Sequence, residues 1–118
     1  MYKILIADDK EDMLSRLSEF LRRPDYELIK AHSGDEASAR ILQGGLDCII
    51  LDDHMPPGPA GSRIADETQK KDPNIPIILW STGASDYALL FKDTNVIPFD
   101  KGDFVELKKY VNRVLPKK

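Results

Sequence analysis

The chain has 118 residues, of which 42% are hydrophobic, and it contains one cysteine. A chain of this length buries about two-thirds of its unfolded surface, so we expect one domain over residues 1–118 that needs neither disulfides nor structural zinc. The formal net charge of −3 argues against nucleic acid as a partner. The single thiol, and the lack of any apolar run that could target or span a membrane, indicate a cytoplasmic protein without a membrane partner.

Apolar runs alternate with amphipathic stretches along the chain. Tyr2–Ala7 predicts a buried first strand, and Asp8 and Asp9 follow it directly. Residues 10–23 place their leucines and a phenylalanine on one stripe, which predicts a helix. The more polar run Tyr26–Ala31 predicts a second strand at an edge of the sheet.

Cap and turn signals bound the next two elements. Ser33 and Glu36 have the spacing of a capping box, so a helix is expected to begin there and to end at Gly44 and Gly45. The continuously apolar run Cys48–Leu51 predicts a third strand that is buried on both faces. Prolines follow this strand closely, and because proline lacks an N–H, the chain must leave the sheet there.

The rest of the chain continues the alternation of helix and strand. We expect five elements, of which the first, third and fifth are helices: Gly61–Lys71, Ile75–Trp80, Ser85–Lys92, Val96–Phe99 and 104–115. Asp103 is expected to cap the last helix. Alternation with short loops requires parallel strands, right-handed crossovers and helices on both faces. The expected fold class is α/β, a three-layer, doubly wound sheet of five parallel strands, with no output domain in this chain.

Polar residues stand at the carboxyl ends of four of the expected strands. Asp8 and Asp9 follow the first strand, Asp52 the third, Ser81 the fourth and Lys101 the fifth. The carboxyl ends of parallel strands lie at one edge of the sheet, where folds of this kind bind their ligands. These five side chains are therefore expected to meet.

This set of residues suits phosphoryl chemistry. Clustered carboxylates repel one another and attract a proton or a cation, and Mg²⁺ is the expected occupant because it is held by carboxylates and waters beside phosphates. Lys101 would offer a positive charge to a phosphoryl oxygen, and Ser81 a hydroxyl. Asp52 is then a candidate nucleophile that forms an acyl phosphate. The chain has no glycine-rich phosphate loop, which argues against bound ATP.

The same residues carry a resemblance to a known family. With Asp8 and Asp9 after the first strand, the motif Asp52–Pro56 after the third, Ser81 after the fourth and Lys101 after the fifth, the whole chain resembles a response-regulator receiver domain of two-component phosphorelay signalling. The resemblance implies the strand order 2-1-3-4-5 of CheY-like and flavodoxin-like folds. It also implies a signalling switch that catalyses its own phosphorylation and dephosphorylation.

The resemblance assigns roles in phosphorylation and metal binding. Asp52 would accept the phosphoryl group from the phosphohistidine of a partner histidine kinase or phosphotransfer protein. Asp9 and Asp52 would bind Mg²⁺ directly, together with the backbone carbonyl of His54, and Asp8 would act through water.

Further roles concern the phosphoryl oxygens and the output. Ser81 and Lys101 would hold the phosphoryl oxygens, together with the backbone at Asp53 and Thr82. Phosphorylation would change the surface formed by the fourth helix, the fifth strand and the last helix, where a downstream protein would bind.

Asp53 competes with Asp52 as the acceptor. The family's spacing to Met55 and Pro56 selects Asp52, and alternation along a strand turns the two side chains to opposite faces. His54 is expected to supply only its backbone carbonyl to the metal. Its side chain is expected, as a hypothesis, to tune the lifetime of the acyl phosphate.

Several features depart from the family pattern. Gly102 stands where proline usually follows the lysine, and Thr82 where alanine or glycine is common. Pro98 stands where an aromatic side chain usually swings inward, and Phe99 next to it should point to the opposite side. We therefore expect phosphoryl chemistry to be retained and its signal to take a modified route.

Two other functions remain open. One is a receiver-like interaction module that is not phosphorylated. The other is an enzyme of another class on the same fold, such as a flavoprotein or a haloacid-dehalogenase-like phosphatase. A phosphatase of the haloacid-dehalogenase type needs Asp-x-Asp after its first strand, whereas Asp8 and Asp9 are adjacent.

Overall fold

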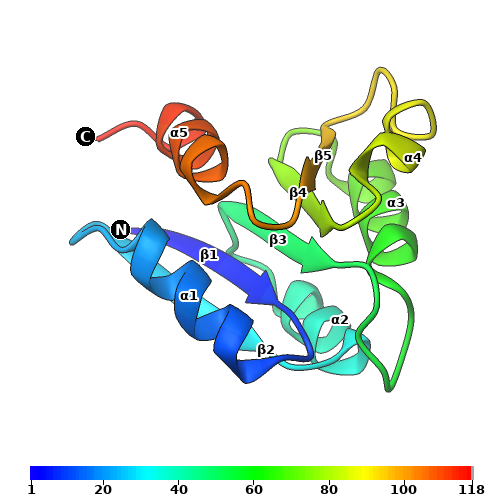
Figure 1. Ribbon diagram of the computed structural model, residues 1–118, viewed down its shortest axis with the longest axis horizontal. Coiled ribbons are helices and arrows are strands. Elements are labelled where there is room, and N and C mark those ends of the chain that lie inside the picture. Colours follow the sequence, from blue (N-terminus) through cyan, green and yellow to red (C-terminus); the bar gives the residue numbers. More distant parts are fainter. Residues whose placement is uncertain (118) are drawn as a thin grey trace.

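The computed structural model describes residues 1–117 and shows strands and helices in strict alternation (Figure 1). Its elements are, in chain order, β1 (Tyr2–Ala7), α1 (Glu11–Leu21), β2 (Tyr26–Ala31), α2 (Gly34–Gln43), β3 (Cys48–Asp52), α3 (Gly61–Lys71), β4 (Ile77–Ser81), α4 (Ala84–Ala88), β5 (Val96–Asp100) and α5 (Phe104–Val114). The type and order of these elements are those that the sequence predicts.

The strands form one parallel sheet in the order β2-β1-β3-β4-β5. The expected strand order is confirmed, and β2 lies at an edge as expected. In register, Asp52 pairs with Trp80, and Ser81 pairs with Asp100. The carboxyl ends of β1, β3, β4 and β5 therefore lie along one edge of the sheet.

Helices cover both faces of the sheet and enclose a hydrophobic core on each (Figure 1). On one face α1 and α5 pack over the strands, and the buried side chains include Ile4, Ile6, Leu14, Leu17, Ile50, Ile78, Trp80, Phe104, Leu107 and Val111. On the other face lie α2, α3 and the segment after α4, and the buried side chains include Leu5, Ala37, Ile49, Leu51, Ile64, Ile77, Leu79 and Phe91. Adjacent residues of β3 thus face opposite layers, as the pleat of a strand requires.

The caps of α2 follow the sequence in part. Oγ of Ser33 accepts a hydrogen bond from the backbone N–H of Glu36 over 3.1 Å, as expected of a capping box. The carboxylate of Glu36 accepts from the N–H of His32 over 3.3 Å, and not from Ser33 as that motif predicts. Gly44 and Gly45 follow α2 with φ of 75° and 78°, which glycine adopts without steric cost.

Several boundaries differ from the prediction, among them the start of β4 and the end of α4. β4 begins at Ile77 and not at Ile75, because Pro76 between them has no N–H for the ladder. α4 ends at Ala88 and not at Lys92. Beyond it the N–H of Lys92 donates to the carbonyl three residues earlier over 3.3 Å, so the chain forms turns there in place of a continued α-helix.

The expected cap of α5 is wrong. Asp103 precedes this helix with φ of −86° and ψ of 59°, and within residues 1–117 its side chain caps no N–H group. A capping side chain needs an extended backbone at that position, which these angles do not provide.

The helices are short. The longest have 11 residues and so measure about 16 Å. None of the helices in the described part of the chain combines the length and the apolar character that a membrane crossing needs.

Candidate functional site

Three carboxylates lie together at the carboxyl edge of the sheet. Asp8 and Asp9 follow β1 and Asp52 ends β3, and because these strands are neighbours, they bring the side chains together. One carboxylate oxygen of each lies within 4.8 Å of the others. Asp8 is completely buried and Asp52 is 6% exposed, whereas Asp9 is exposed. The structure thus brings these three residues together as the sequence predicts.

Lys101 joins the carboxylates from the turn after β5. Its Nζ lies 3.0 Å from Oδ2 of Asp8 and 2.8 Å from Oδ1 of Asp52. Its backbone N–H donates to the carbonyl of Ser81 over 3.0 Å, which fixes the turn beside β4. The other carboxylate oxygen of Asp8 accepts from the N–H of Lys10 over 2.9 Å. Lys101 therefore contacts the acidic cluster, as expected from the sequence.

Burial and charge act together on the pKa values of this site. Burial raises the pKa of Asp52, and although Lys101 opposes this, the neighbouring Asp8 adds to it, so the net shift is upward. For Lys101 burial alone would lower the pKa, but the hydrogen bonds to Asp52 and Asp8 outweigh it and raise the pKa. Both pKa values are raised because the single ammonium of Lys101 is shared between two carboxylates. The site therefore favours additional positive charge.

Ser81, Thr82 and His54 lie at the same edge of the sheet as Asp52. Ser81 is 7% exposed, and its Oγ accepts a hydrogen bond from the N–H of Gly83 over 3.1 Å. Its own hydroxyl proton can therefore point toward a ligand. The side chains of Thr82 and His54 are exposed.

The donor set fits a hard divalent cation. Asp8, Asp9 and Asp52 offer only carboxylate oxygens, and these are the ligands that Mg²⁺ prefers. Asp9 is exposed and opens the cluster to solvent, so a cation held there can keep waters or bind a phosphoryl oxygen. Chemically, the arrangement suits transfer of a phosphoryl group to a carboxylate.

Asp53 faces the other layer of the molecule and is held by two hydrogen bonds. Its Oδ1 accepts from the backbone N–H of Ser62 over 3.0 Å, and its Oδ2 accepts from the hydroxyl of Tyr87. Burial opposes ionisation here, but the hydrogen bonds from Tyr87 and Ser62 outweigh it and lower the pKa of Asp53. The alternation that turns Asp53 away from Asp52 is confirmed.

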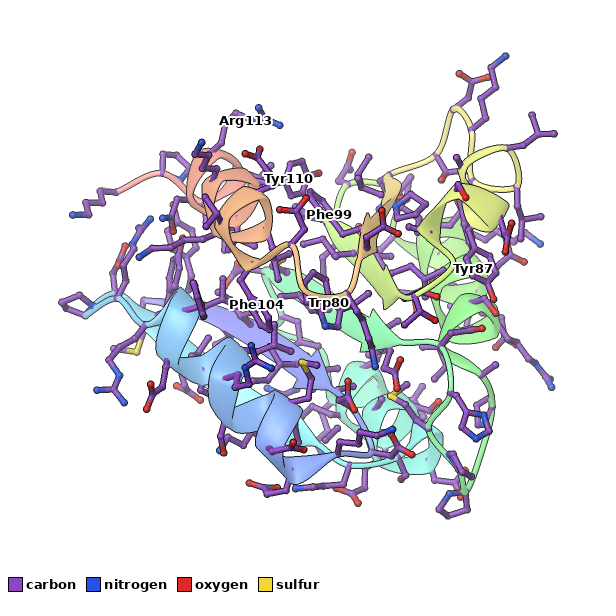
Figure 2. All side chains as sticks on the ribbon, in the orientation of Figure 1. Trp80, Tyr87, Phe99, Phe104, Tyr110 and Arg113 are labelled. Atoms are coloured by element: carbon purple, nitrogen blue, oxygen red, sulfur yellow. The ribbon has the colours of Figure 1, made fainter. Side chains whose placement is uncertain are left out.

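Sequence reasoning did not single out Tyr87. Figure 2 shows this residue on the α4 side of the sheet, far from Trp80 and Phe104 beside α5. The hydrogen bond to Asp53 is the main cause of its raised pKa. Its partner depends on where a five-residue helix docks, and no periodicity or spacing in the chain carries that information.

The loop between β3 and α3 is docked on the first turn of α2. The N–H groups of Gly34 and Asp35 donate to the carbonyls of Met55 and Pro57 over 2.6 and 3.1 Å. Gly34 leaves no space for a side chain, since a Cβ there would lie 2.1 Å from the carbonyl oxygen of Pro59. The loop that follows the acidic cluster is therefore fixed by a close backbone contact.

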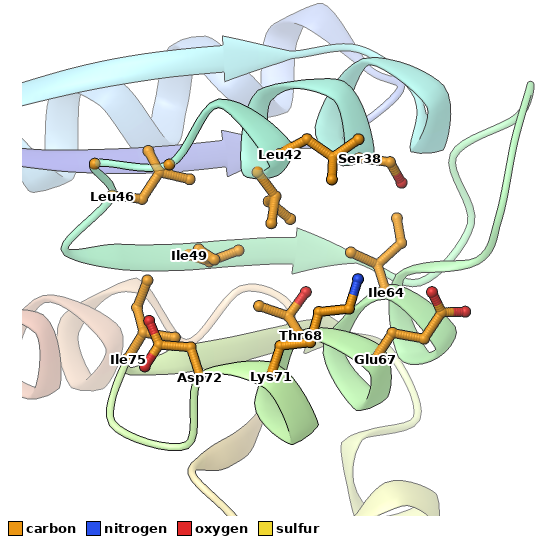
Figure 3. A pocket seen from close by; sticks show the side chains of 13 residues that line it. Ser38, Leu42, Leu46, Ile49, Ile64, Glu67, Thr68, Lys71, Asp72 and Ile75 are labelled. Carbon is orange, nitrogen blue, oxygen red and sulfur yellow. The ribbon is translucent and has the colours of Figure 1, made fainter.

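A cavity of about 500 Å³ lies between α2 and α3, toward the opposite end of the strands (Figure 3). Ile49 of β3 lies at its base, and Leu42 and Lys71 border it from the two helices. Its volume is in the range of small-molecule sites. The described residues that line it include neither the acidic cluster nor Ser81 nor Lys101, so the cavity is separate from this chemistry.

Comparison with known proteins agrees with this geometry. The family model for the response regulator receiver domain matches residues 4–96. The transcriptional regulatory protein YrkP of Bacillus subtilis (strain 168) is 34% identical over 84 residues, which are 71% of this chain and 35% of that protein. The chain thus spans about a third of the length of this relative.

Solved structures match along nearly the whole chain. The response regulator TrrA of Thermotoga maritima, in complex with Mg²⁺ and BeF, aligns with a TM-score of 0.79 and 32% identity, over 97% of this chain and 99% of that chain. A complex of the histidine kinase ThkA with TrrA aligns with a TM-score of 0.78 and 32% identity, over 98% of this chain and 99% of that chain.

Proposed function

This chain belongs to the family of response regulator receiver domains, and on that basis we propose that it works in two-component signalling with Asp52 as its phosphoacceptor. The observation that supports this most is the position of Lys101, whose ammonium lies 2.8 Å from Asp52 and 3.0 Å from Asp8. The adjacent carboxylate, Asp53, points to the other layer and is engaged by Tyr87. Asp52 is thus the better placed of the two.

We assign Mg²⁺ to the acidic cluster. Asp9 and Asp52 would be direct ligands with the backbone carbonyl of His54, and Asp8 would act through water. Mg²⁺ would supply the positive charge that neutralises the carboxylates and a phosphoryl oxygen. The likeness to TrrA, which was solved with Mg²⁺ and BeF, supports this assignment.

The transfer needs no base in the receiver. A carboxylate oxygen of Asp52 would form a bond to phosphorus while the bond from phosphorus to the donor's histidine nitrogen breaks. The imidazole leaves with that electron pair and takes up a proton. Lys101 and the hydroxyl of Ser81, with the backbone N–H groups of Asp53 and Thr82, would bind the phosphoryl oxygens as negative charge moves onto the site.

The donor would be a histidine kinase or a phosphotransfer protein. The complex of ThkA with TrrA supports a kinase as the partner. We further propose that residues 1–118 form one receiver domain and that the protein acts in the cytoplasm. The downstream protein would bind the surface of α4, β5 and α5. On β5, Phe99 packs against Tyr110 of α5 with ring centroids 5.6 Å apart (Figure 2). The preceding residue is Pro98, which is not aromatic and has a rigid ring, so no aromatic side chain at this position can carry the signal.

A mass measurement tests the acceptor. Wild-type protein incubated with Mg²⁺ and acetyl phosphate should gain the mass of one phosphoryl group. Asp52→Asn should gain none, while the matched control Asp53→Asn, one residue away, should still be labelled. When a chelator removes Mg²⁺ before the reaction, the wild-type protein should gain no mass.

Other outcomes would redirect the assignment. Uptake that survives in Asp52→Asn and disappears in Asp53→Asn would move the acceptor to Asp53. No uptake from acetyl phosphate or from a phosphorylated histidine kinase would instead favour a receiver-like interaction module.

A further inference from the structure

Asp53 is held by two elements that follow it in the chain, through its backbone carbonyl and through its side chain. From α3, the N–H of Gly61 donates to the carbonyl of Asp53 over 2.9 Å, and the N–H of Ser62 donates to its carboxylate over 3.0 Å. From α4, the hydroxyl of Tyr87 donates to the second carboxylate oxygen. Asp53 therefore ties the end of β3 to both helices.

The contacts of α3 leave little freedom at this point. A Cβ on Gly61 would lie 2.0 Å from the carbonyl oxygen of Asp52, so the backbones of α3 and β3 are in direct contact. The contact from α4 is of another kind. It is made by one side chain of a five-residue helix that begins three residues after Ser81.

The ring of Tyr87 is partly buried against the core that contains Leu51, Leu79 and Phe91. Its place is thus set by packing, and the hydroxyl is presented to Asp53 without the loss of much side-chain freedom. A hydrogen bond between a phenol and a carboxylate is charge-assisted and stronger than one between neutral groups. This contact can therefore orient the segment that follows Asp52.

We infer that Tyr87 is a positioning residue for the metal and phosphoryl site, acting through Asp53, and that this hydrogen bond links α4 to the occupancy of that site. The inference rests on the proposed function of Asp52. By holding the side chain of Asp53, Tyr87 fixes the backbone of Asp53 and His54, from which one N–H and one carbonyl are assigned to the phosphoryl group and to Mg²⁺. Because coupling is reciprocal, a ligand that reorients this backbone also shifts α4.

The test compares Tyr87→Phe, which loses only the hydroxyl, with Tyr110→Phe as the matched control. Tyr110 is also partly buried, and its ring packs against Phe99 of β5, away from Asp53. Mg²⁺ binding is measured by isothermal titration calorimetry, and labelling by acetyl phosphate is measured as a function of Mg²⁺ concentration. Tyr87→Phe should weaken Mg²⁺ binding about tenfold, and Tyr110→Phe should bind like the wild type.

Labelling separates positioning from general damage. In Tyr87→Phe the half-saturating Mg²⁺ concentration should rise by the same factor, while in Tyr110→Phe both this concentration and the rate at saturating Mg²⁺ stay within about twofold of the wild type. Asp53→Ala removes the partner of the hydroxyl, so Tyr87→Phe should add nothing in that background. Hydrogen exchange of the α4 amides should slow on Mg²⁺ addition in the wild type and not in Tyr87→Phe.

Equal Mg²⁺ affinity in Tyr87→Phe, Tyr110→Phe and wild type would overturn the inference and leave the phosphoacceptor untouched. A further loss from Tyr87→Phe in the Asp53→Ala background would also overturn it, because the hydroxyl would then act by another route. Failure of the wild type to take up a phosphoryl group would instead remove the proposed function itself.

Discussion

Three carboxylates and one ammonium give the acidic site a formal charge of −2 when all four groups are ionised. A divalent cation would neutralise this charge, whereas a monovalent one would not. Lys101 is shared by Asp8 and Asp52, so it cannot neutralise both. At the scale of single residues, the excess charge is what makes the site selective for the charge of its ligand.

His32 is a second residue whose charge has consequences. Its Nε2 lies 2.6 Å from Oε2 of Glu11 and its Nδ1 lies 3.5 Å from Oε1 of Glu36, while Lys30 lies 3.8 Å from Glu11. The hydrogen bond to Glu11 is the main cause of the raised pKa of His32. Protonated His32 therefore joins the end of β2 to α1 and α2.

This predicts a pH-dependent stability. Because the folded-state pKa is raised, the stabilisation by His32 is fully present below its ordinary pKa of 6.5 and is lost as pH rises through the folded value. In His32→Gln the free energy of unfolding should be lower than in wild type by less than about 1 kcal/mol, since the pair is half exposed. Chemical denaturation at about pH 5.5 and about pH 8.5 measures the difference, which should vanish at the higher pH. An equal difference at both values would contradict the prediction.

Single residues were predictable where a strand end fixes their place. Asp8, Asp52 and Ser81 follow or end apolar runs that can only be buried strands, so parallel pairing brings them to one edge. The pairing of Asp53 with Tyr87 was not predictable, because it joins a strand end to a helix whose position is set by tertiary packing. The roles of His54 and Thr82 stay predictions.

At the scale of elements, α2 and the loop after β3 form one unit. The first turn of α2 donates two N–H groups to that loop, and Gly34 lets the two backbones touch. A helix start that binds carbonyls of another segment in place of its own side chains satisfies N–H groups that would otherwise lack partners. The loop is thereby kept in register with the acidic cluster.

Gly34→Ala should destabilise the protein by about 1–3 kcal/mol. A methyl group at this position would lie 2.1 Å from a backbone oxygen of Pro59, and a backbone atom cannot move aside as a flexible side chain does. Helix propensity alone favours alanine over glycine, so the sign of the effect tests the contact. Thermal or urea unfolding measures it, with Ser38→Ala on the same helix as a control that should stay within about 0.5 kcal/mol. A Gly34→Ala protein as stable as the wild type would show that the loop is not docked so closely.

The elements themselves were predictable to the degree that their signals are local. The glycine pair after α2 and the apolar runs of β1 and β3 gave the correct bounds within a residue. α4 ends four residues earlier than expected, at Ala88, and the chain beyond it forms turns in which the N–H of one residue donates to the carbonyl three residues earlier. Asp103 failed as a cap for a reason of backbone angle, which a residue type alone does not disclose.

At the scale of the whole molecule, the acidic edge should couple metal binding to stability. Mg²⁺ at ten times its dissociation constant adds about 1.4 kcal/mol to the free energy of unfolding, a rise in Tm of about 6 °C for a domain of this size. Asp9→Asn should lose most of this rise. Asp12→Asn, an exposed charge change three residues further along the chain, should keep it. Differential scanning calorimetry with and without Mg²⁺ measures both, and an undiminished rise in Asp9→Asn would remove Asp9 from the ligand set.

The overall fold was the most predictable feature because it rests on many residues at once. Five apolar runs alternate with five helical segments. When the loops are short, this alternation is possible only with parallel strands that are joined by crossover helices on both faces of the sheet. The cavity between α2 and α3 was not predictable in the same way, since its volume depends on how closely two helices approach each other.

The pleat of β3 has a consequence for how far a signal must travel. Asp52 and Asp53 point into different layers of the molecule, one toward Lys101 and the other toward Tyr87. A single peptide unit therefore separates the chemistry on one side of the sheet from the helix on the other. In the proposed switch, the phosphoacceptor and the residue that contacts α4 are neighbours in the chain, so no relay of intermediate side chains is needed between them.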